Sequence, residues 1–305
     1  MMKQVGWRWQ RTIEQPVIVE GFGYITGNWS RVRFRPARPN AGILFQRIDL
    51  RNAPVVPARI EQVTGANRRT IIGHAPAQIE LIEHVMAALA GLKIDNCIVE
   101  LNTAEPPGLD GSSQCFVEAL TEEAGIQLQR EKRLIYSVCE PITVTDGRAT
   151  LTMHPSDEPG LKVSYILDYG YSSPLGCHRH TQRITADRFL NELAMCRTFL
   201  TAAEASTMQQ LGIGVNTTAA DLLVYGEHGP IGGNHVRFAN EPARHKVLDI
   251  VGDMALFHAD LQGHIVGYKS GHALNTVLVR RLTQELAVPQ NNTSTMDVRP
   301  LLRVA

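Results

Sequence analysis

Strand-like segments followed by helix-like segments occur twice along this chain. This repeated order is the sequence feature that most constrains its fold. Short strand-like runs, at 16–20 and 31–35, are followed by helical periodicity in 74–92. After a polar, charged stretch at 127–133 the order restarts with strands, and helices follow again. No close sequence repeat accompanies this order. Each half of the chain is therefore expected to combine strands with helices.

The chain length fits about two domains. With 305 residues, of which 44% are hydrophobic, each half could bury a core of its own. We expect an N-terminal domain at 1–127, a linker in the segment "QLQREKR" at 127–133, and a C-terminal domain at 133–287. The remaining residues, 288–305, are polar with few packing signals, and are expected to form a loose tail.

Charge and composition exclude several classes of function. Lys plus Arg equals Asp plus Glu, 30 against 30, so net charge gives no case for binding nucleic acid or an anionic membrane. The N-terminus lacks the apolar run of a signal peptide, and no stretch approaches the roughly 18 apolar residues of a transmembrane helix. The five cysteines are scattered without C-x-x-C pairs, which favours a reducing compartment such as the cytoplasm.

The stretch "ARHKVLDIVGD" at 243–253 carries a clear sign of chemistry. It reads as part of an amphipathic helix at about 241–258, with His245, Asp249 and Asp253 at i, i+4 and i+8 on one face. An imidazole and a carboxylate one turn apart are a common pair of metal ligands. The same spacing also suits a hydrogen bond on a solvated helix face, and the pair alone does not decide between the two.

Two further segments offer acid–base groups. Glu83 and His84 are adjacent on the first predicted helix, about 100° apart, so both cannot face one core. Either they place a base beside a metal-bound water, or Glu83 is solvated and His84 lies at the core boundary. His272 follows a glycine at the start of the final helix. It could be a general acid with Asp253 as its partner, or a histidine without a chemical role.

Other motifs are weaker. The glycines of "GFGYITG" have the wrong spacing for a dinucleotide-binding loop, so this segment reads as a turn. His178 and His180 in "CHRHT" could bind a metal, but their polar setting predicts a loop with solvated side chains. The G-x-S-x-G elbow of serine hydrolases is absent.

Four segments together resemble the motifs of one enzyme family. In chain order they are "IEHVMAALAGLKIDNCIVELNTAEPPGLDGSSQCFVEAL", "CRTF", "RHKVLDIVGDMAL" and "GYKSGHALN". They are similar to the motifs of the LpxC family, the zinc-dependent UDP-3-O-acyl-N-acetylglucosamine deacetylases, and the agreement covers nearly the whole chain. The resemblance implies an α+β fold of two domains with similar topology. The helices would be sandwiched between two sheets, and the active site would lie between the domains.

The resemblance also implies a metal centre and a base. His84, His245 and Asp249 match the family's zinc ligands, and Glu83 matches its catalytic base. Two histidines and one carboxylate leave a fourth position open, which is the arrangement of a catalytic rather than a structural zinc. Zn²⁺ is therefore the expected cofactor.

The remaining matches concern the acid and the substrate. His272 matches the general acid and Asp253 the carboxylate paired with it. The residues expected around the substrate are Thr198 at the oxyanion, Phe199 against the sugar, Lys246 near the phosphates, and Asp168 with Tyr169 near the uridine.

Two departures from the family pattern concern the substrate side. Ile25 stands where the family has a histidine in its first turn, and "NTTAADLLV" at 216–224 replaces a glycine-containing segment of the acyl tunnel. We expect a monomeric, cytoplasmic zinc amidohydrolase that deacetylates UDP-3-O-(3-hydroxyacyl)-N-acetylglucosamine in lipid A biosynthesis. The alternatives are a deacetylase of another N-acetylated nucleotide sugar or glycan, and a non-catalytic nucleotide-sugar-binding relative.

Overall fold

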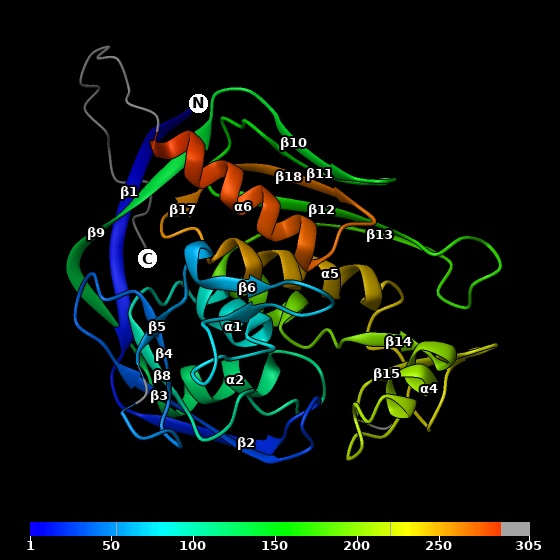
Figure 1. The fold of residues 1–305 in the computed structure, drawn as a ribbon. Coiled ribbons are helices and arrows are strands. Elements are labelled where there is room, and N and C mark those ends of the chain that lie inside the picture. The colour runs from blue at the N-terminus through cyan, green and yellow to red at the C-terminus, as the bar shows by residue number, and fades with distance from the viewer. Residues whose placement is uncertain (53, 220, 288–305) are drawn as a thin grey trace.

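Two five-stranded sheets form the outer layers of the computed structural model, which describes residues 1–52, 54–219 and 221–287 (Figure 1). The first sheet, in spatial order, comprises β2 (Val17–Phe22), β3 (Trp29–Pro36), β8 (Cys97–Leu101), β4 (Ile43–Arg47) and β5 (Val56–Pro57). The second comprises β10 (Ile142–Asp146), β11 (Ala149–His154), β18 (Gly263–Tyr268), β12 (Leu161–Asp168) and β13 (Cys177–Arg183).

The two sheets have the same topology. In each, the last strand along the chain inserts between the second and third strands. It runs antiparallel to the second and parallel to the third, as in β3–β8–β4 and β11–β18–β12. The twofold order of strands and helices in the sequence therefore reflects two similar α+β units, and the expected fold class is confirmed.

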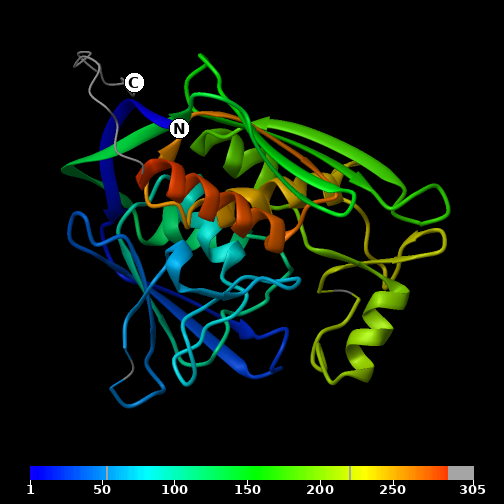
Figure 2. The same ribbon diagram turned by 45° about the horizontal axis from the view of Figure 1, so that its top comes forward.

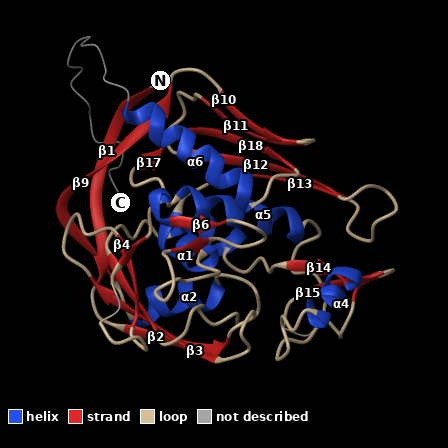
Figure 3. Ribbon diagram, in the orientation of Figure 1, coloured by secondary structure: helices blue, strands red, loops and turns tan. Residues whose placement is uncertain are grey.

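The main helices lie between the two sheets, as Figure 3 shows. They are α1 (Glu83–Gly91), α2 (Gln114–Glu118, continued by a π-helical turn at Ala119–Glu123), α5 (Glu241–Met254) and α6 (His272–Ala287). Helix α1 precedes the inserted strand β8, and α5 precedes the inserted strand β18 with only the short β17 between them, so these two helices are equivalent elements of the two units. They pack directly on each other at the centre of the molecule, and their buried residues belong to one continuous hydrophobic core.

A third sheet joins the two units, and it contains the segment that was predicted to be a linker. Its strands are β1 (Met2–Ile13), β9 (Ile126–Val138) and β17 (Asp260–Leu261). The segment 127–133 lies inside β9, where its backbone pairs with β1. Its charged side chains are mostly exposed, so its polar composition is compatible with a strand whose hydrogen bonds are made by the backbone. The division into domains on either side of this segment stays a prediction.

Two other expectations were wrong in detail. The helix predicted in 74–92 begins only at Glu83, because Ile79 pairs with Ile72 in a β-bridge and Leu81 has a positive φ of 55°. The segment "CHRHT" is not a loop but the start of β13. The expected loose tail, 288–305, lies outside the described residues.

The remaining elements are short, and some of them form a lobe beside the helices. They are η1 (Ile60–Gln62), β6 (Val63–Gly65), β7 (Ile71–Ile72), α3 (Ala186–Arg188, continued by a π-helical turn at Phe189–Leu193), β14 (Phe199–Thr201), α4 (Ala202–Gln210), β15 (Leu223–Gly226) and β16 (Gly229–Pro230). Helix α4 and strands β14–β16 make up this lobe (Figure 2). Among the described helices, none is long and apolar enough to cross a membrane.

Candidate metal centre and catalytic cleft

Helix α5 presents one row of polar side chains to the interior. His245, Asp249 and Asp253 are each only 1% exposed. The other faces of the helix are largely buried as well. The helix can approach α1 closely because Gly252 has no side chain: a Cβ atom there would collide with the backbone oxygen of Glu83. The contact brings the row on α5 against the first turn of α1, which carries Glu83 and His84.

Three side chains form a set of metal donors. The His245 Nε2 and His84 Nε2 atoms lie 3.2 Å and 3.8 Å from Asp249 Oδ1, and all three donor atoms lie within 4.8 Å of one another. Asp249 Oδ1 is buried and has no hydrogen-bond partner among the residues that the structure describes. A buried carboxylate oxygen without a donor is costly, so its position between two imidazole nitrogens fits a cation-binding site.

The two histidines suit this role because burial keeps them neutral. Burial lowers the pKa of His84 to about 3, and it lowers the pKa of His245 as well. A neutral imidazole has a free lone pair for a metal. The other ring nitrogen of His245, Nδ1, lies 3.0 Å from the backbone oxygen of Cys196, which orients the ring and leaves Nε2 facing the donor set.

Glu83 lies beside the donor set and is positioned by Thr70. The Thr70 backbone N–H donates to Glu83 Oε2 over 3.0 Å, and Glu83 Oε1 lies 3.9 Å from His272 Nε2. Burial raises the pKa of Glu83 to about 7, against the opposing charge of His272. A carboxyl group with this pKa can accept a proton near neutral pH.

His272 is held in its cationic form by carboxylates. Burial alone would lower its pKa, but Asp253, Asp249 and Glu83 outweigh burial and raise the pKa to about 10. The cationic ring donates Nδ1–H to Asp253 Oδ2 over 2.7 Å. Asp253 also accepts hydrogen bonds from the Thr70 hydroxyl at 2.6 Å and the Asn275 amide at 2.8 Å. A proton donor and a proton acceptor thus flank the same three-donor centre.

The "CRTF" segment forms another wall of the site. Arg197 ties it to α5, donating from its backbone N–H and its Nε to Glu241 Oε1 over 3.0 Å and 2.9 Å, in a fully buried pair. Thr198 and Phe199 both line a cleft of about 740 Å³ that contains the donor set. The Phe199 ring packs edge-on against His245, with centroids 6.2 Å apart.

The residues expected to bind the nucleotide line the same cleft. Lys246 Nζ donates to Asp249 Oδ2 over 2.7 Å, so this ammonium group lies beside the donor set. Asp168 accepts a hydrogen bond of 2.8 Å from Tyr268 and pairs with Lys269 at 3.2 Å. The Tyr169 ring lies 6.2 Å from that of Phe199. Of the sequence-predicted site residues, all but Asp253 line this cleft, and Asp253 contacts it through its hydrogen bond with His272.

The two departures from the family pattern also border the cleft. Ile25 lies in the β2–β3 turn, where its N–H donates to Glu105 over 2.9 Å. Within 216–224, the described lining residues are Thr217, Thr218, Ala219, Leu222 and Val224. His178 and His180 lie on β13 and, among the described residues, belong to no group of three or more metal donors.

Sequence reasoning did not find the residues that hold the catalytic groups in place. Thr70 and Asn275 bind Asp253, and the Arg197–Glu241 pair fixes the "CRTF" segment to α5. The sequence did contain a signal for Asn275, because this residue follows His272 by three positions and so shares its helix face. It contained no such signal for Thr70, which lies outside the motifs.

Comparisons with known proteins agree with this geometry. The model of the LpxC family, described as UDP-3-O-acyl N-acetylglycosamine deacetylase, matches residues 10–284. A UDP-3-O-acyl-N-acetylglucosamine deacetylase of Chlamydia pneumoniae is 35% identical over 92% of this chain and 98% of its own, and one of Anaeromyxobacter dehalogenans is 36% identical over 91% and 88%. A bifunctional enzyme LpxC/FabZ of Chlorobaculum tepidum is 35% identical over 90% of this chain, which spans only 64% of that relative's length. On these matches, the chain belongs to the LpxC family.

Proposed function

We propose that this protein is a zinc-dependent amidohydrolase that removes the acetyl group from UDP-3-O-(3-hydroxyacyl)-N-acetylglucosamine. One observation carries the proposal: a two-histidine, one-carboxylate donor set lies beside both a carboxyl group with a pKa of about 7 and a histidine held cationic. A module that only binds its ligand has no need for a base and an acid together. The names of the relatives support the substrate.

His84, His245 and Asp249 would hold the zinc ion. Two neutral imidazoles and a carboxylate are ligands that Zn²⁺ prefers, and three protein ligands leave a position open. When bound, zinc supplies a Lewis acid that polarises the acetamide carbonyl and lowers the pKa of water.

Glu83 and His272 would move the protons of the reaction. Glu83 takes a proton from the attacking water while the oxygen of that water forms a bond to the acetamide carbon. His272 gives its proton to the departing nitrogen as the C–N bond breaks, so that acetate and a free amine leave. Asp253 keeps His272 charged and oriented through the 2.7 Å hydrogen bond at Nδ1. The Thr198 hydroxyl would stabilise the oxyanion.

The rest of the cleft would bind the substrate. Phe199 offers an aromatic face for the sugar, Lys246 a positive charge for the diphosphate, and Asp168 with Tyr169 a polar and aromatic edge for uridine. The acyl chain would enter the part of the cleft bordered by Ile25 and 216–224. A cleft of about 740 Å³ is large enough for a ligand of this class. We propose that the protein acts as a monomer in the cytoplasm, at the committed step of lipid A biosynthesis.

The test is mass-spectrometric detection of the deacetylated product from zinc-loaded protein. The substrates are UDP-3-O-(3-hydroxyacyl)-N-acetylglucosamine at several chain lengths and unacylated UDP-N-acetylglucosamine, with Glu83→Ala as the control. We expect product from the unchanged protein alone, and faster turnover of acylated substrate. Equal rates on both sugars would favour a deacetylase of other N-acetylated sugars. No product from a folded, zinc-replete sample would contradict the proposal.

A further inference from the structure

A second cavity lies away from the catalytic cleft, at the sheet that joins the two units. It has a volume of about 370 Å³ and is bordered by β1, β9 and β17 and by the C-terminal ends of α1 and α5. In the described part of the chain, it shares no lining residue with the catalytic cleft. Its size is in the range of small-molecule pockets.

Positive charge dominates the described lining of this cavity. The charged residues are the cations Arg8, Arg59, Lys93, Lys132 and Arg133 and the carboxylates Asp95 and Asp260. Arg8 by itself neutralises much of the negative charge. It donates two hydrogen bonds of 2.7 Å to Asp95 and contacts Asp260 at 2.7 Å and 3.0 Å. Much of the charge on the other four cations is therefore not compensated within the cavity.

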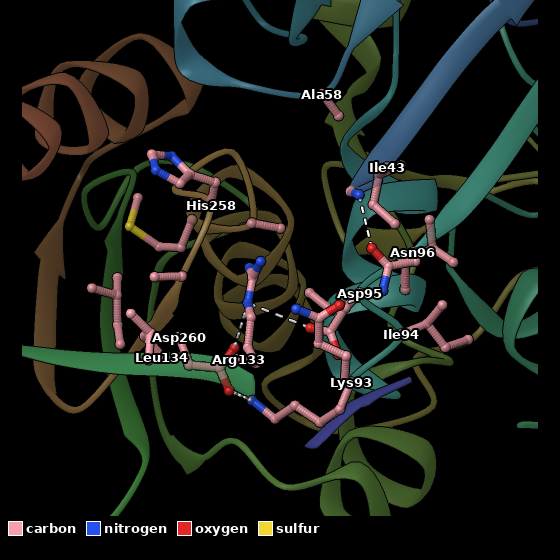
Figure 4. Close-up of a pocket in the computed structure, with 18 of the residues that line it drawn as sticks. Ile43, Ala58, Lys93, Ile94, Asp95, Asn96, Arg133, Leu134, His258 and Asp260 are labelled. Atoms are coloured by element: carbon pink, nitrogen blue, oxygen red, sulfur yellow. Dashed lines mark hydrogen bonds and ion pairs between the residues drawn. The ribbon is translucent and has the colours of Figure 1, made fainter. Parts of the chain in front are cut away.

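Arg133 and Lys93 approach the same carboxylates only at longer distances. Arg133 Nε lies 3.4 Å from Asp95 Oδ1 and 3.3 Å from Asp260 Oδ1, and Lys93 Nζ lies 3.9 Å from Asp260 Oδ2. Figure 4 shows the guanidinium group of Arg133 extending into the space on the side of His258. Its two terminal nitrogens have no hydrogen-bond partner among the described residues.

Arg59 adds to the positive potential of the cavity, and its charge is felt by the neighbouring His258. The Arg59 guanidinium is exposed and makes no hydrogen bond or ion pair within the described residues. The pKa of His258 is lowered first by burial and then by the charges of Arg59 and Arg133. Both cations therefore act on the same part of the cavity, although Arg59 comes from the loop after β5 and Arg133 from the sheet that joins the two units.

We propose that this cavity binds a small phosphate-bearing molecule, with its phosphate or diphosphate group at the free guanidinium nitrogens of Arg59 and Arg133. Guanidinium groups with free terminal nitrogens match the oxygens of a phosphate. Apolar residues of the wall, such as Met86 and Leu134, leave a surface for an organic part of the ligand. The site is independent of the deacetylase reaction and of zinc.

The test is calorimetric titration of the zinc-loaded full chain with inorganic pyrophosphate at constant ionic strength. We expect the unchanged protein to bind, and Arg59→Gln to weaken binding about tenfold, because a charged hydrogen-bond donor is lost. The Arg59 guanidinium has no hydrogen-bond or ion-pair partner among the described residues, so its replacement should leave stability unchanged. The matched control is Arg130→Gln, which removes an exposed charge from the same strand as Arg133 but outside the cavity. This control should bind as the unchanged protein does.

Two further titrations establish where pyrophosphate binds and whether its phosphate groups are recognised. Lys246→Met removes a cation from the catalytic cleft and should leave binding in the second cavity intact. If Lys246→Met abolishes pyrophosphate binding and Arg59→Gln does not, the anion belongs to the catalytic cleft and the proposal is overturned. Citrate is titrated in parallel, and binding as tight as that of pyrophosphate would contradict the phosphate assignment. Absence of pyrophosphate binding at millimolar concentration would also overturn it.

Discussion

The pKa values of Glu83 and His272 are both raised, but burial and neighbouring charges contribute differently to the two. Burial dominates at Glu83 and raises its pKa to about 7, whereas three carboxylates overcome burial at His272 and raise its pKa to about 10. Near neutral pH, an acceptor and a donor of protons therefore coexist 3.9 Å apart. Such a separation of roles is what general acid–base catalysis of amide hydrolysis requires.

Replacing Asp253 with asparagine should move the basic limb of the pH–rate profile to lower pH. The Asp253 carboxylate is the largest of the charges that raise the pKa of His272. Without it, His272 loses its proton at lower pH, and the acid form is lost sooner as pH rises. The measurement is kcat/KM between pH 6 and 10 for both proteins. An unmoved limb would mean that Asp253 serves another purpose.

Replacing His84 with alanine should remove most of the bound zinc. One of the three donors is lost, and a site of two ligands binds Zn²⁺ far more weakly. Metal analysis after dialysis measures the zinc content per chain. His178→Ala is the matched control, because His178 lies on β13 away from the donor set. Equal zinc in His84→Ala and the unchanged protein would contradict the ligand assignment.

At the scale of elements, the site depends on how closely α1 and α5 approach. The two helices are equivalent parts of the two units and meet at Gly252, where the Glu83 backbone oxygen occupies the space of a side chain. The proposed base and one proposed ligand on α1 are thereby placed against two proposed ligands on α5. The close contact between the two helices therefore explains why the motif "DIVGD" has a glycine at this position.

Gly252→Ala should lower both stability and zinc content. The added methyl group would force the helices apart, because backbone atoms of Glu83 and Ala87 stand in its place. Overpacking of this kind costs about 1–3 kcal/mol of unfolding free energy. Urea unfolding and metal analysis measure the two effects. Gly271→Ala is the stability control, since no atom of the described residues, apart from those of its chain neighbours, lies within 4 Å of its added Cβ. Equal stability of the two variants would contradict this account.

At the scale of the whole molecule, one buried ion cluster joins distant parts of the chain. Arg8 on β1 binds Asp95, which precedes β8, and Asp260 on β17. Burial would raise the pKa of Asp260, but Arg8 and Lys93 outweigh it and hold that pKa well below its usual range. The cluster thus holds the joining sheet to both units.

Arg8→Met should destabilise the fold by about 3 kcal/mol at pH 7, because two buried carboxylates lose their main partner. Since the folded-state pKa of Asp260 is depressed, its stabilisation is present above the unfolded value of about 4 and is lost as pH falls below it. The difference between the two proteins should therefore shrink below about pH 4.

Urea unfolding at pH 7 and pH 3.5 measures this difference. Arg31→Met is the control, because Arg31 and its partner Glu20 form an exposed pair that contributes at most about 1 kcal/mol. A pH-independent difference for Arg8→Met would mean that lost packing, rather than lost charge, explains the effect.

Much of the fold and the composition of the site could be predicted from local patterns. The spacing of His245, Asp249 and Asp253 places them on one helix face whatever surrounds the helix. The repeated order of elements indicated that each half combines strands with helices, and the family resemblance implied that the two halves have similar topology. Errors arose where tertiary contacts overrule composition. The charged segment 127–133 is a strand because β1 pairs with its backbone, and residues before Glu83 are not helical because Ile79 pairs with Ile72.

The sequence by itself determined which chemical groups the chain carries and which of them share an element, because helix periodicity is a local property. Only the tertiary structure decided that Glu83 and His84 face the row on α5, that Thr70 binds Asp253, and that five cations gather around a second cavity. These contacts join residues far apart in the chain, and they exist because two similar units pack their central helices on each other. Burial at that contact, which no local pattern encodes, also raises the pKa of Glu83 to about 7 and keeps His84 neutral.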